Sequence, residues 1–432
     1  MAKIVFATFG SLGDVHPFIA LGHALQERNH DVVLAVPDAH TAKVRAAGLE
    51  AASIFPPFEE VGRRLHFTSE EEVVRKVMED PHFCIRDFLV PSLMESCASL
   101  LSASEGASAI VGQFLALAGP IVAEKMNVPY IPAHMHPMSF LSATDPPSGA
   151  QFRVLVPAPR WSVSRRWNRG WVRLMRFFLK HRYARYVDPV RRAYGLPPVT
   201  RSPIFDTERA APLTLGLYSR ALGAPQDDFP PNTHIVGFPM FDSESGRPQP
   251  VDANLLRFLA AGPPPVVFTL GSLAVFAAGN FYSDSLAVAR ALGRRAVLLT
   301  GVERNAPVAD ESVFVCRYAP HSAVFPKSAA VVHHGGMGTM GQALRAGVPQ
   351  LVVPHLGDQW DNGARAARLG FGRVLDARHY TAPRATALLR ELLSDPTVGT
   401  RVTQLRQVVC NESGARTGAA VLDAFLARAP IG

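Results

Sequence analysis

The sequence lacks the features that mark several common protein classes. Its four cysteines in 432 residues form neither a Cys-x-x-Cys pair nor a metal-ligand spacing, so they indicate reduced core thiols. The uncharged stretches 106–123 and 263–281 are broken by glycine and proline, which argues against membrane spans. No signal peptide is apparent, because Lys3 leads directly into a strand-like run. These absences predict a cytoplasmic globular protein.

Familiar phosphate and metal motifs are missing from the places where they would be diagnostic. The first strand–turn–helix unit carries only Gly10-x-x-Gly13, which is too loose for a dinucleotide fingerprint. No Gly-Lys-Ser/Thr completes a Walker loop, and no Asp-x-Asp motif indicates a metal site. The sequence therefore disfavours an NAD enzyme and a P-loop NTPase, and we expect neither a metal nor a cofactor.

Three strand-like runs of the second half each end in a polar or glycine-rich turn. Residues 318–321 (YAPH) follow SVFVCR, residues 333–339 (HHGGMGT) follow AAVV, and residues 356–359 (LGDQ) follow QLVVP. Because ligands of open α/β sheets bind beyond the carboxyl ends of the strands, we expect one pocket at these turns.

The middle turn predicts a phosphate site. Gly335, Gly336 and Gly338 let the backbone approach a ligand, and a helix that begins near Thr339 offers free N–H groups and its dipole. His334 and Thr339 add side-chain donors. A glycine cluster alone is equally typical of an ordinary strand-to-helix turn, but the two flanking turns favour a ligand.

The last turn suits a sugar. Asp358 and Gln359 together supply carboxylate and amide groups that can bind vicinal hydroxyls. The alternative is a capping aspartate in a polar loop.

These turns resemble the nucleotide-diphosphosugar signature of glycosyltransferases with two Rossmann-like domains, the GT-B fold. The relevant branch holds plant secondary-metabolite, sterol and antibiotic glycosyltransferases. The runs GSLGDVHPFIALG, YAPHSAVFP and GDQWDN are most similar to the bacterial rhamnosyltransferases of rhamnolipid synthesis. The resemblance covers nearly the whole chain.

The resemblance implies three sets of donor contacts. The donor diphosphate would be bound by Ser272, His334, Gly335, Gly336, Gly338 and Thr339, the nucleoside by Thr300, Tyr318, Ala319, His321 and Gln342, and the donor sugar by Asp358 and Gln359. Gln342 departs from the family's ribose-binding glutamate. This departure leaves uridine and thymidine donors both open.

The first turn carries the candidate base of the reaction. In Gly13-Asp14-Val15-His16-Pro17, Asp14 aligns with the family's catalytic histidine, as in sterol and antibiotic members. A positioned carboxylate can accept the proton of an attacking alcohol. The competing interpretation is that Asp14 caps the following helix. His16 is a second candidate base. Gln113 takes the position of the family's orienting aspartate.

The acceptor pocket is expected in the first half of the chain. His16, Gln113, His134 and His136 are candidate lining residues, although each histidine is also consistent with a structural role. The apolar, Phe- and Met-rich segments of this half fit a lipophilic acceptor, although such residues are equally typical of the core.

Residues 160–192 concentrate positive charge. They hold eleven Lys/Arg and one Asp, a net charge of +10 against +8 for the whole chain. Trp167, Trp171, Leu174 and Phe178 would share one helical face. Such a helix could pack on its domain with a solvated basic face, contact an anionic membrane, or bind nucleic acid. Nothing else in the sequence supports nucleic acid.

The alternation of strand-like and helical runs predicts an α/β protein with two doubly wound Rossmann-like domains facing across a cleft. We expect an acceptor domain over 1–238, a linker over 239–264 and a nucleotide-sugar domain over 265–410. A last helix near 411–428 would pack back on the first domain.

The resemblance implies an inverting O-glycosyltransferase that moves a hexose from a dTDP-rhamnose or UDP-glucose type donor to a hydroxyl of a glycolipid or natural product. Two other hypotheses keep the fold. One is a sugar-nucleotide epimerase or hydrolase, and the other is an inactive, membrane-associated binding protein.

Overall fold

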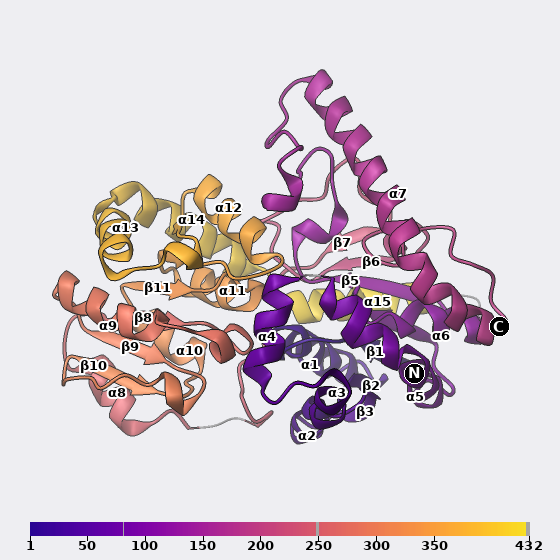
Figure 1. Ribbon diagram of the computed structural model, residues 1–432, viewed down its shortest axis with the longest axis horizontal. Helices are drawn as coiled ribbons and strands as arrows, with labels where there is room; N and C mark the ends of the chain where they lie inside the picture. Colours follow the sequence, from indigo (N-terminus) through magenta and orange to yellow (C-terminus); the bar gives the residue numbers. More distant parts are fainter. Residues whose placement is uncertain (81, 248–249, 429–432) are drawn as a thin grey trace. The chain divides into compact units, whose positions relative to one another are not determined.

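The computed structural model describes residues 1–80, 82–247 and 250–428, which form two compact units (Figure 1). The N-terminal unit comprises Met1–Thr68, Asp80–Phe241 and Glu412–Gly432, and the C-terminal unit comprises Ser69–Glu79 and Asp242–Asn411. Each unit contains one parallel sheet.

The sheet of the N-terminal unit has seven strands in the order β3-β2-β1-β4-β5-β6-β7. Their bounds are β1 Lys3–Ala7, β2 Asp31–Pro37, β3 Glu50–Phe55, β4 Ala109–Gly112, β5 Tyr130–His134, β6 Thr214–Gly216 and β7 Thr233–Ile235. The associated helices are α1 Leu12–Gln26, α2 Asp38–Ala46, α3 Phe58–Leu65, α5 Leu93–Ala103, α6 Ala118–Met126, α7 Ser162–Ala193 and α15 Gly414–Leu426.

Both faces of this sheet are covered, because alternate residues of its strands point to opposite sides. Ile4 and Phe6 of β1 lie in one apolar core together with Leu21 of α1 and Leu422 of α15. The next residue along β1, Val5, lies in the other core, which α5 and α6 cover. Helix α15 therefore packs beside α1 although it is the last helix of the chain.

The sheet of the C-terminal unit has six strands in the order β10-β9-β8-β11-β12-β13. Their bounds are β8 Val266–Thr269, β9 Ala296–Leu299, β10 Val313–Cys316, β11 Ala330–His333, β12 Gln350–Val352 and β13 Gly372–Val374. The helices are α4 Glu70–Glu79, α8 Ala253–Ala260, α9 Phe281–Leu292, α10 His321–Val324, α11 Met337–Ala346, α12 Gln359–Leu369, α13 Ala382–Ser394 and α14 Pro396–Asn411. The two parallel, doubly wound sheets confirm the predicted fold class.

Two details differ from the expected organisation. The stretch expected to be a linker, 239–264, contains α8, whose Leu255 and Leu259 lie in the core of the C-terminal unit. Helix α4 comes from the first half of the chain but belongs to the C-terminal unit. It packs on the turn at Ala274–Ala277, and Glu71 pairs with Arg304 at 3.2 Å. Both helices are short, and α4 is also highly charged, so their tertiary partners were not apparent from their sequence.

Candidate functional site

The expected donor residues gather at one edge of the C-terminal sheet. Ser272 follows β8, Thr300 follows β9, Tyr318 follows β10, and His334 follows β11. Because these strands are parallel neighbours, the turns after them lie together. The chain reverses its winding direction between β8 and β11, and open α/β sheets bind ligands at such a switch point.

The ring of His334 is fixed by two glycines. A Cβ atom on Gly271 would lie 2.9 Å from His334 Nε2, and one on Gly336 would lie 3.0 Å from Cε1 and nearer still to Nε2. Only glycine leaves room for the imidazole at both positions. Burial and the neighbouring histidines hold the pKa of His334 well below its usual range, so the ring is neutral. Its Nδ1 is buried and has no hydrogen-bond partner among the described residues.

Helix α11 begins directly after this ring. The N–H of Met340 donates to the carbonyl of Gly336, so the N–H groups of Met337, Gly338 and Thr339 are those that a helix leaves without a partner inside it. Gly338 is exposed and Thr339 is buried. A neutral imidazole beside a helix N-terminus is a site for phosphate oxygens.

The preceding histidine has a different role. His333 is fully buried, its Nδ1 accepts the N–H of Gly335 at 3.1 Å, and its Nε2 lies 2.9 Å from Gln350 Oε1. His333 therefore holds the turn in shape, which leaves His334 as the ligand-facing candidate of the pair.

The nucleoside-side residues are held by backbone and carboxylate contacts. Thr300 donates its N–H to the carbonyl of Cys316 at 2.9 Å. Tyr318 donates its hydroxyl to Asp242 Oδ1 at 3.2 Å, and the other oxygen of Asp242 accepts the N–H of Ser322 at 2.7 Å. Burial and Asp242 raise the pKa of Tyr318. The ring therefore stays protonated and fixed.

Of the remaining nucleoside candidates, Ala319 and His321 follow β10, and Gln342 lies on α11. His321 begins α10, and its ring stacks on Phe325 with centroids 4.4 Å apart. Burial lowers the pKa of His321. Ala319 and Gln342 are buried, the latter on α11.

Asn362 links the turn after β12, which carries Asp358 and Gln359, to the turn after β11, which carries His334. Its amide Nδ2 donates to the carbonyl of Gly335 at 2.9 Å and to Asp358 Oδ2 at 2.7 Å. Gln359 bonds within its own loop instead: its Oε1 accepts the N–H groups of His355 and Leu356 at 2.8 and 3.1 Å. The Gln359 oxygen therefore shapes the loop, and its amide NH₂ is the group that can serve a ligand.

Asp14 lies in the turn after β1 and completes a capping box. Its Oδ2 accepts the N–H of Ser11 at 2.9 Å, and the Ser11 hydroxyl accepts the N–H of Gly13. Gly10, at a φ of +134°, lies against this carboxylate. Burial and Asp14 raise the pKa of the Cys84 thiol to about 12, so the carboxylate also lies near Cys84. Asp14 thus acts as a helix-capping residue in this structure.

Gln113 and His16 both contact other residues of the N-terminal unit. Gln113 is buried after β4, where its amide donates to the carbonyl of Phe9 and its oxygen accepts the N–H of Leu115 at 2.8 Å. It thereby fixes the turn that carries Asp14. The ring of His16 packs edge-on against Phe241 with centroids 5.3 Å apart.

His134 and His136 lie at the end of β5, beside β4. His136 pairs with the Ser139 hydroxyl at 3.0 Å. His134 is buried 3.9 Å from the carboxylate of Glu208, and burial lowers the pKa of His134 to about 3. Burial also raises the pKa of Glu208 to about 7. His134 is therefore neutral near neutral pH, whereas Glu208 is about half protonated there.

Sequence reasoning assigned no role to Asp242 or Glu208 and treated Asn362 only as part of a polar loop. Asp242 and Glu208 are far along the chain from their partners Tyr318 and His134, and Asn362 is 27 residues from Gly335. A further signal in the sequence is the Gly-x-Gly-x-x-Gly spacing of Gly336, Gly338 and Gly341, here after β11. That spacing again indicates close approach of the backbone to a diphosphate.

The chain is similar to known glycosyltransferases along its whole length. Residues 4–140 match the glycosyltransferase family 28 N-terminal domain, and residues 303–415 match the erythromycin biosynthesis protein CIII-like C-terminal domain. O-mycaminosyltylonolide 6-deoxyallosyltransferase of Streptomyces fradiae is 30% identical, over 98% of this chain and 97% of its own length.

Solved structures share the fold. The glycosyltransferase of kitacinnamycin has a TM-score of 0.70 at 21% identity and covers 98% of this chain and 99% of its own. The glycosyltransferase VinC, solved in complex with dTDP, has a TM-score of 0.66 at 18% identity and covers 99% of this chain and 100% of its own.

Proposed function

Because this chain belongs to the glycosyltransferases of the GT-B fold, we propose that it is an inverting O-glycosyltransferase. It transfers a hexose or deoxyhexose from a nucleoside-diphosphate sugar to a hydroxyl of a lipophilic natural product or glycolipid. The observation that carries this proposal is the His334 imidazole, held between Gly271 and Gly336 at the start of α11.

In this proposal the C-terminal unit binds the donor. His334, Thr339 and the first N–H groups of α11 hold the diphosphate, and the helix dipole offsets its charge without a metal. Tyr318 borders the nucleobase, fixed by Asp242. Asp358 and the amide NH₂ of Gln359 bind the sugar hydroxyls.

The reaction uses Asp14 as the base. The acceptor oxygen attacks the anomeric carbon while its proton passes to the Asp14 carboxylate. The bond from that carbon to the diphosphate oxygen breaks, and the nucleoside diphosphate leaves. Attack opposite the leaving group inverts the anomeric centre. A carboxylate accepts up to about four hydrogen bonds, so capping and proton acceptance are compatible.

For the donor, we propose a dTDP-deoxyhexose of the rhamnose type first and a UDP-glucose type second. The neutral amide of Gln342 is compatible with either nucleoside and does not decide between them. The dTDP bound to VinC and the 6-deoxyallosyl transfer named for the Streptomyces fradiae relative support this order of donors.

For the acceptor, aromatic rings in the turns after β1 and β4, the turns that carry Asp14 and Gln113, favour an apolar molecule. Phe9, whose carbonyl is held by Gln113, packs against Phe55 and Phe88 with centroids 4.9 and 6.0 Å apart. Phe114 follows Gln113 directly and stacks on Phe205 at 4.7 Å. A hydroxyl on a macrolide, polyketide or hydroxy-fatty-acid scaffold is the proposed nucleophile.

The test is a matrix of dTDP- and UDP-sugars against such acceptors, with products identified by mass and the anomeric configuration by NMR. The proposal predicts a glycoside formed only when both substrates are present, with inverted configuration. A new sugar nucleotide or free sugar without an acceptor would indicate the epimerase or hydrolase alternative. Donor binding without turnover on any acceptor would indicate an inactive binding protein.

A further inference from the structure

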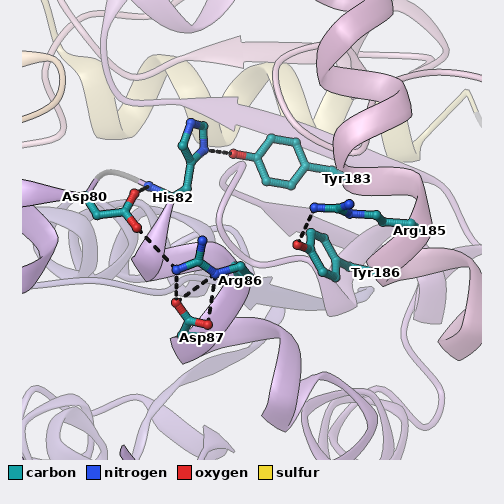
Figure 2. Close-up of polar contacts among 7 residues, drawn as sticks. All are labelled: Asp80, His82, Arg86, Asp87, Tyr183, Arg185 and Tyr186. Atoms are coloured by element: carbon teal, nitrogen blue, oxygen red, sulfur yellow. Dashed lines mark hydrogen bonds and ion pairs between the residues drawn. The ribbon is translucent and has the colours of Figure 1, made fainter.

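Helix α7 has apolar side chains on two opposite faces. Val172, Tyr183, Val187 and Val190 are buried on the inner face. Tyr183 donates or accepts a hydrogen bond with His82 Nδ1 at 2.7 Å, which ties the helix to the segment that also holds the Asp80–Arg86–Asp87 contacts (Figure 2). The inner face is thus a structural interface of the N-terminal unit.

The outer face of α7 exposes a hydrophobic stripe of Val163, Trp167, Leu174, Phe177 and Phe178, which are 75, 53, 40, 54 and 61% exposed. These positions recur at helical spacing, opposite the buried ones. Trp161, just before the helix, is 78% exposed. Trp171, expected on this face, is half-buried instead and packs beside Val172.

This stripe is exceptional for the protein. Of the thirteen large hydrophobic residues exposed among those described, eight lie between residues 154 and 178. Scattered exposed apolar residues need no explanation, but a contiguous apolar patch marks an interaction site. The N-terminal half of α7 also projects away from the sheet of its own unit (Figure 1).

Cations surround the stripe. Most Lys/Arg of the segment are exposed, namely Arg160, Arg165, Arg166, Arg169, Arg173, Arg182, Arg185 and Arg192. The single acidic residue of the segment, Asp188, accepts the N–H of Val199. The field around the stripe is therefore almost wholly positive.

Two hollows adjoin the stripe. An apolar groove of about 540 Å³ lies between Val156, Trp161, Val163 and Trp167. A polar pocket of about 390 Å³ contains Arg176, Lys180, Arg201 and Thr200, together with the carboxylate of Asp206. The apolar groove can hold a hydrocarbon chain. The polar pocket carries cationic side chains of the kind that contact a phosphate.

We propose that α7 docks on the surface of an anionic phospholipid bilayer. The stripe enters the boundary between headgroups and acyl chains, and the flanking arginines contact lipid phosphates. This combination of an apolar face and a basic rim is what an interfacial helix requires. No helix in the described part of the chain is long and apolar enough to cross a membrane.

The charge and the apolar stripe of α7 distinguish an anionic bilayer from two other candidate partners, a second copy of the chain and a nucleic acid. A second copy of the chain would bring two segments of +10 together, and their repulsion opposes pairing. A nucleic acid would satisfy the arginines but would not bury a stripe of valine, leucine and phenylalanine. An anionic bilayer satisfies both at once.

The test is co-sedimentation of the full chain with phosphatidylcholine vesicles that contain or lack phosphatidylglycerol. Three of the four tryptophans are Trp161, Trp167 and Trp171, so a blue shift of tryptophan fluorescence on binding would report this surface. We expect binding only to anionic vesicles, with weaker binding as salt rises from about 0.1 M to about 0.5 M.

The double variant F177S/F178S removes two exposed rings from the stripe and should weaken binding at least about tenfold. The matched control V308S/V408S removes two exposed apolar side chains from the C-terminal unit and should bind like the wild type. Both variants should keep the wild-type melting temperature and the activity measured in solution.

Four results would overturn the proposal: no binding of the wild type to anionic vesicles, equal binding to neutral vesicles, unchanged binding of F177S/F178S, or a wild-type dimer that this variant dissolves. Preferential binding to duplex DNA, retained by F177S/F178S, would assign the segment to nucleic acid instead.

Discussion

Gly336→Ala should disable the donor site while leaving the fold intact. The backbone of Gly336 has a φ of −62°, which alanine adopts without strain. The added methyl, however, would lie 3.0 Å from His334 Cε1 and nearer still to Nε2. Real Cβ contacts are not that short, so the imidazole must leave its place.

The size of the effect follows from the hydrogen bond that is lost. A hydrogen bond to a charged group contributes about 1.5–3 kcal/mol, so dTDP or UDP should bind about 10- to 150-fold more weakly to the variant. Calorimetric titration of each nucleotide measures this directly. If Gly336 acts only through His334, the double variant G336A/H334A should bind no more weakly than H334A alone.

Gly399→Ala, in α14 of the same unit, is the matched control. A Cβ on Gly399 meets nothing within 4 Å, and alanine favours the helix. It should bind nucleotide like the wild type and melt at the same temperature or higher. Equal losses in both variants, or no loss in G336A, would refute the reasoning about the imidazole.

Three other changes test other parts of the account. Asp14→Asn should lower the transfer rate about 10²- to 10⁴-fold with unchanged donor affinity, and an unchanged rate would exclude Asp14 as the base. Asn362→Ala leaves the buried carbonyl of Gly335 without its partner, so it should cost about 1–3 kcal/mol of unfolding free energy and raise the donor KM; thermal melts and kinetics check both. The pKa of Glu208 is raised by burial from 4.5 to about 7, so its stabilising contribution is complete below pH 4.5 and is lost as pH rises to 7. Glu208→Gln should therefore stabilise the fold by about 3 kcal/mol more at pH 8 than at pH 4, and a pH-independent effect in denaturant titrations would contradict this.

The strands of the C-terminal unit could be predicted because parallel strands buried on both faces are continuous apolar runs. The runs VVFT, AVLL and AVVH became β8, β9 and β11. The edge strand β3 was not predicted, since its sequence EAASIF is short and mixed. Helix α8 was not predicted either, because it lies inside a stretch rich in proline and glycine.

Which polar side chains hold the turns in shape, and which face a ligand, could not be predicted from the sequence. The sequence offers His333 and His334 as neighbours, and only the structure shows that one bonds Gly335 and Gln350 while the other stands between glycines. Asp242 and Tyr318 are 76 residues apart, so no local pattern links them. Directions of hydrogen bonds and long-range pairings are properties of the tertiary structure.

The most direct test of the donor site is a crystal structure of the protein with dTDP or UDP bound. The account predicts phosphate oxygens within hydrogen-bonding distance of the His334 ring and the Thr339 hydroxyl, with the nucleobase beside Tyr318. A nucleotide bound elsewhere on the protein, or a diphosphate out of reach of His334, would contradict it.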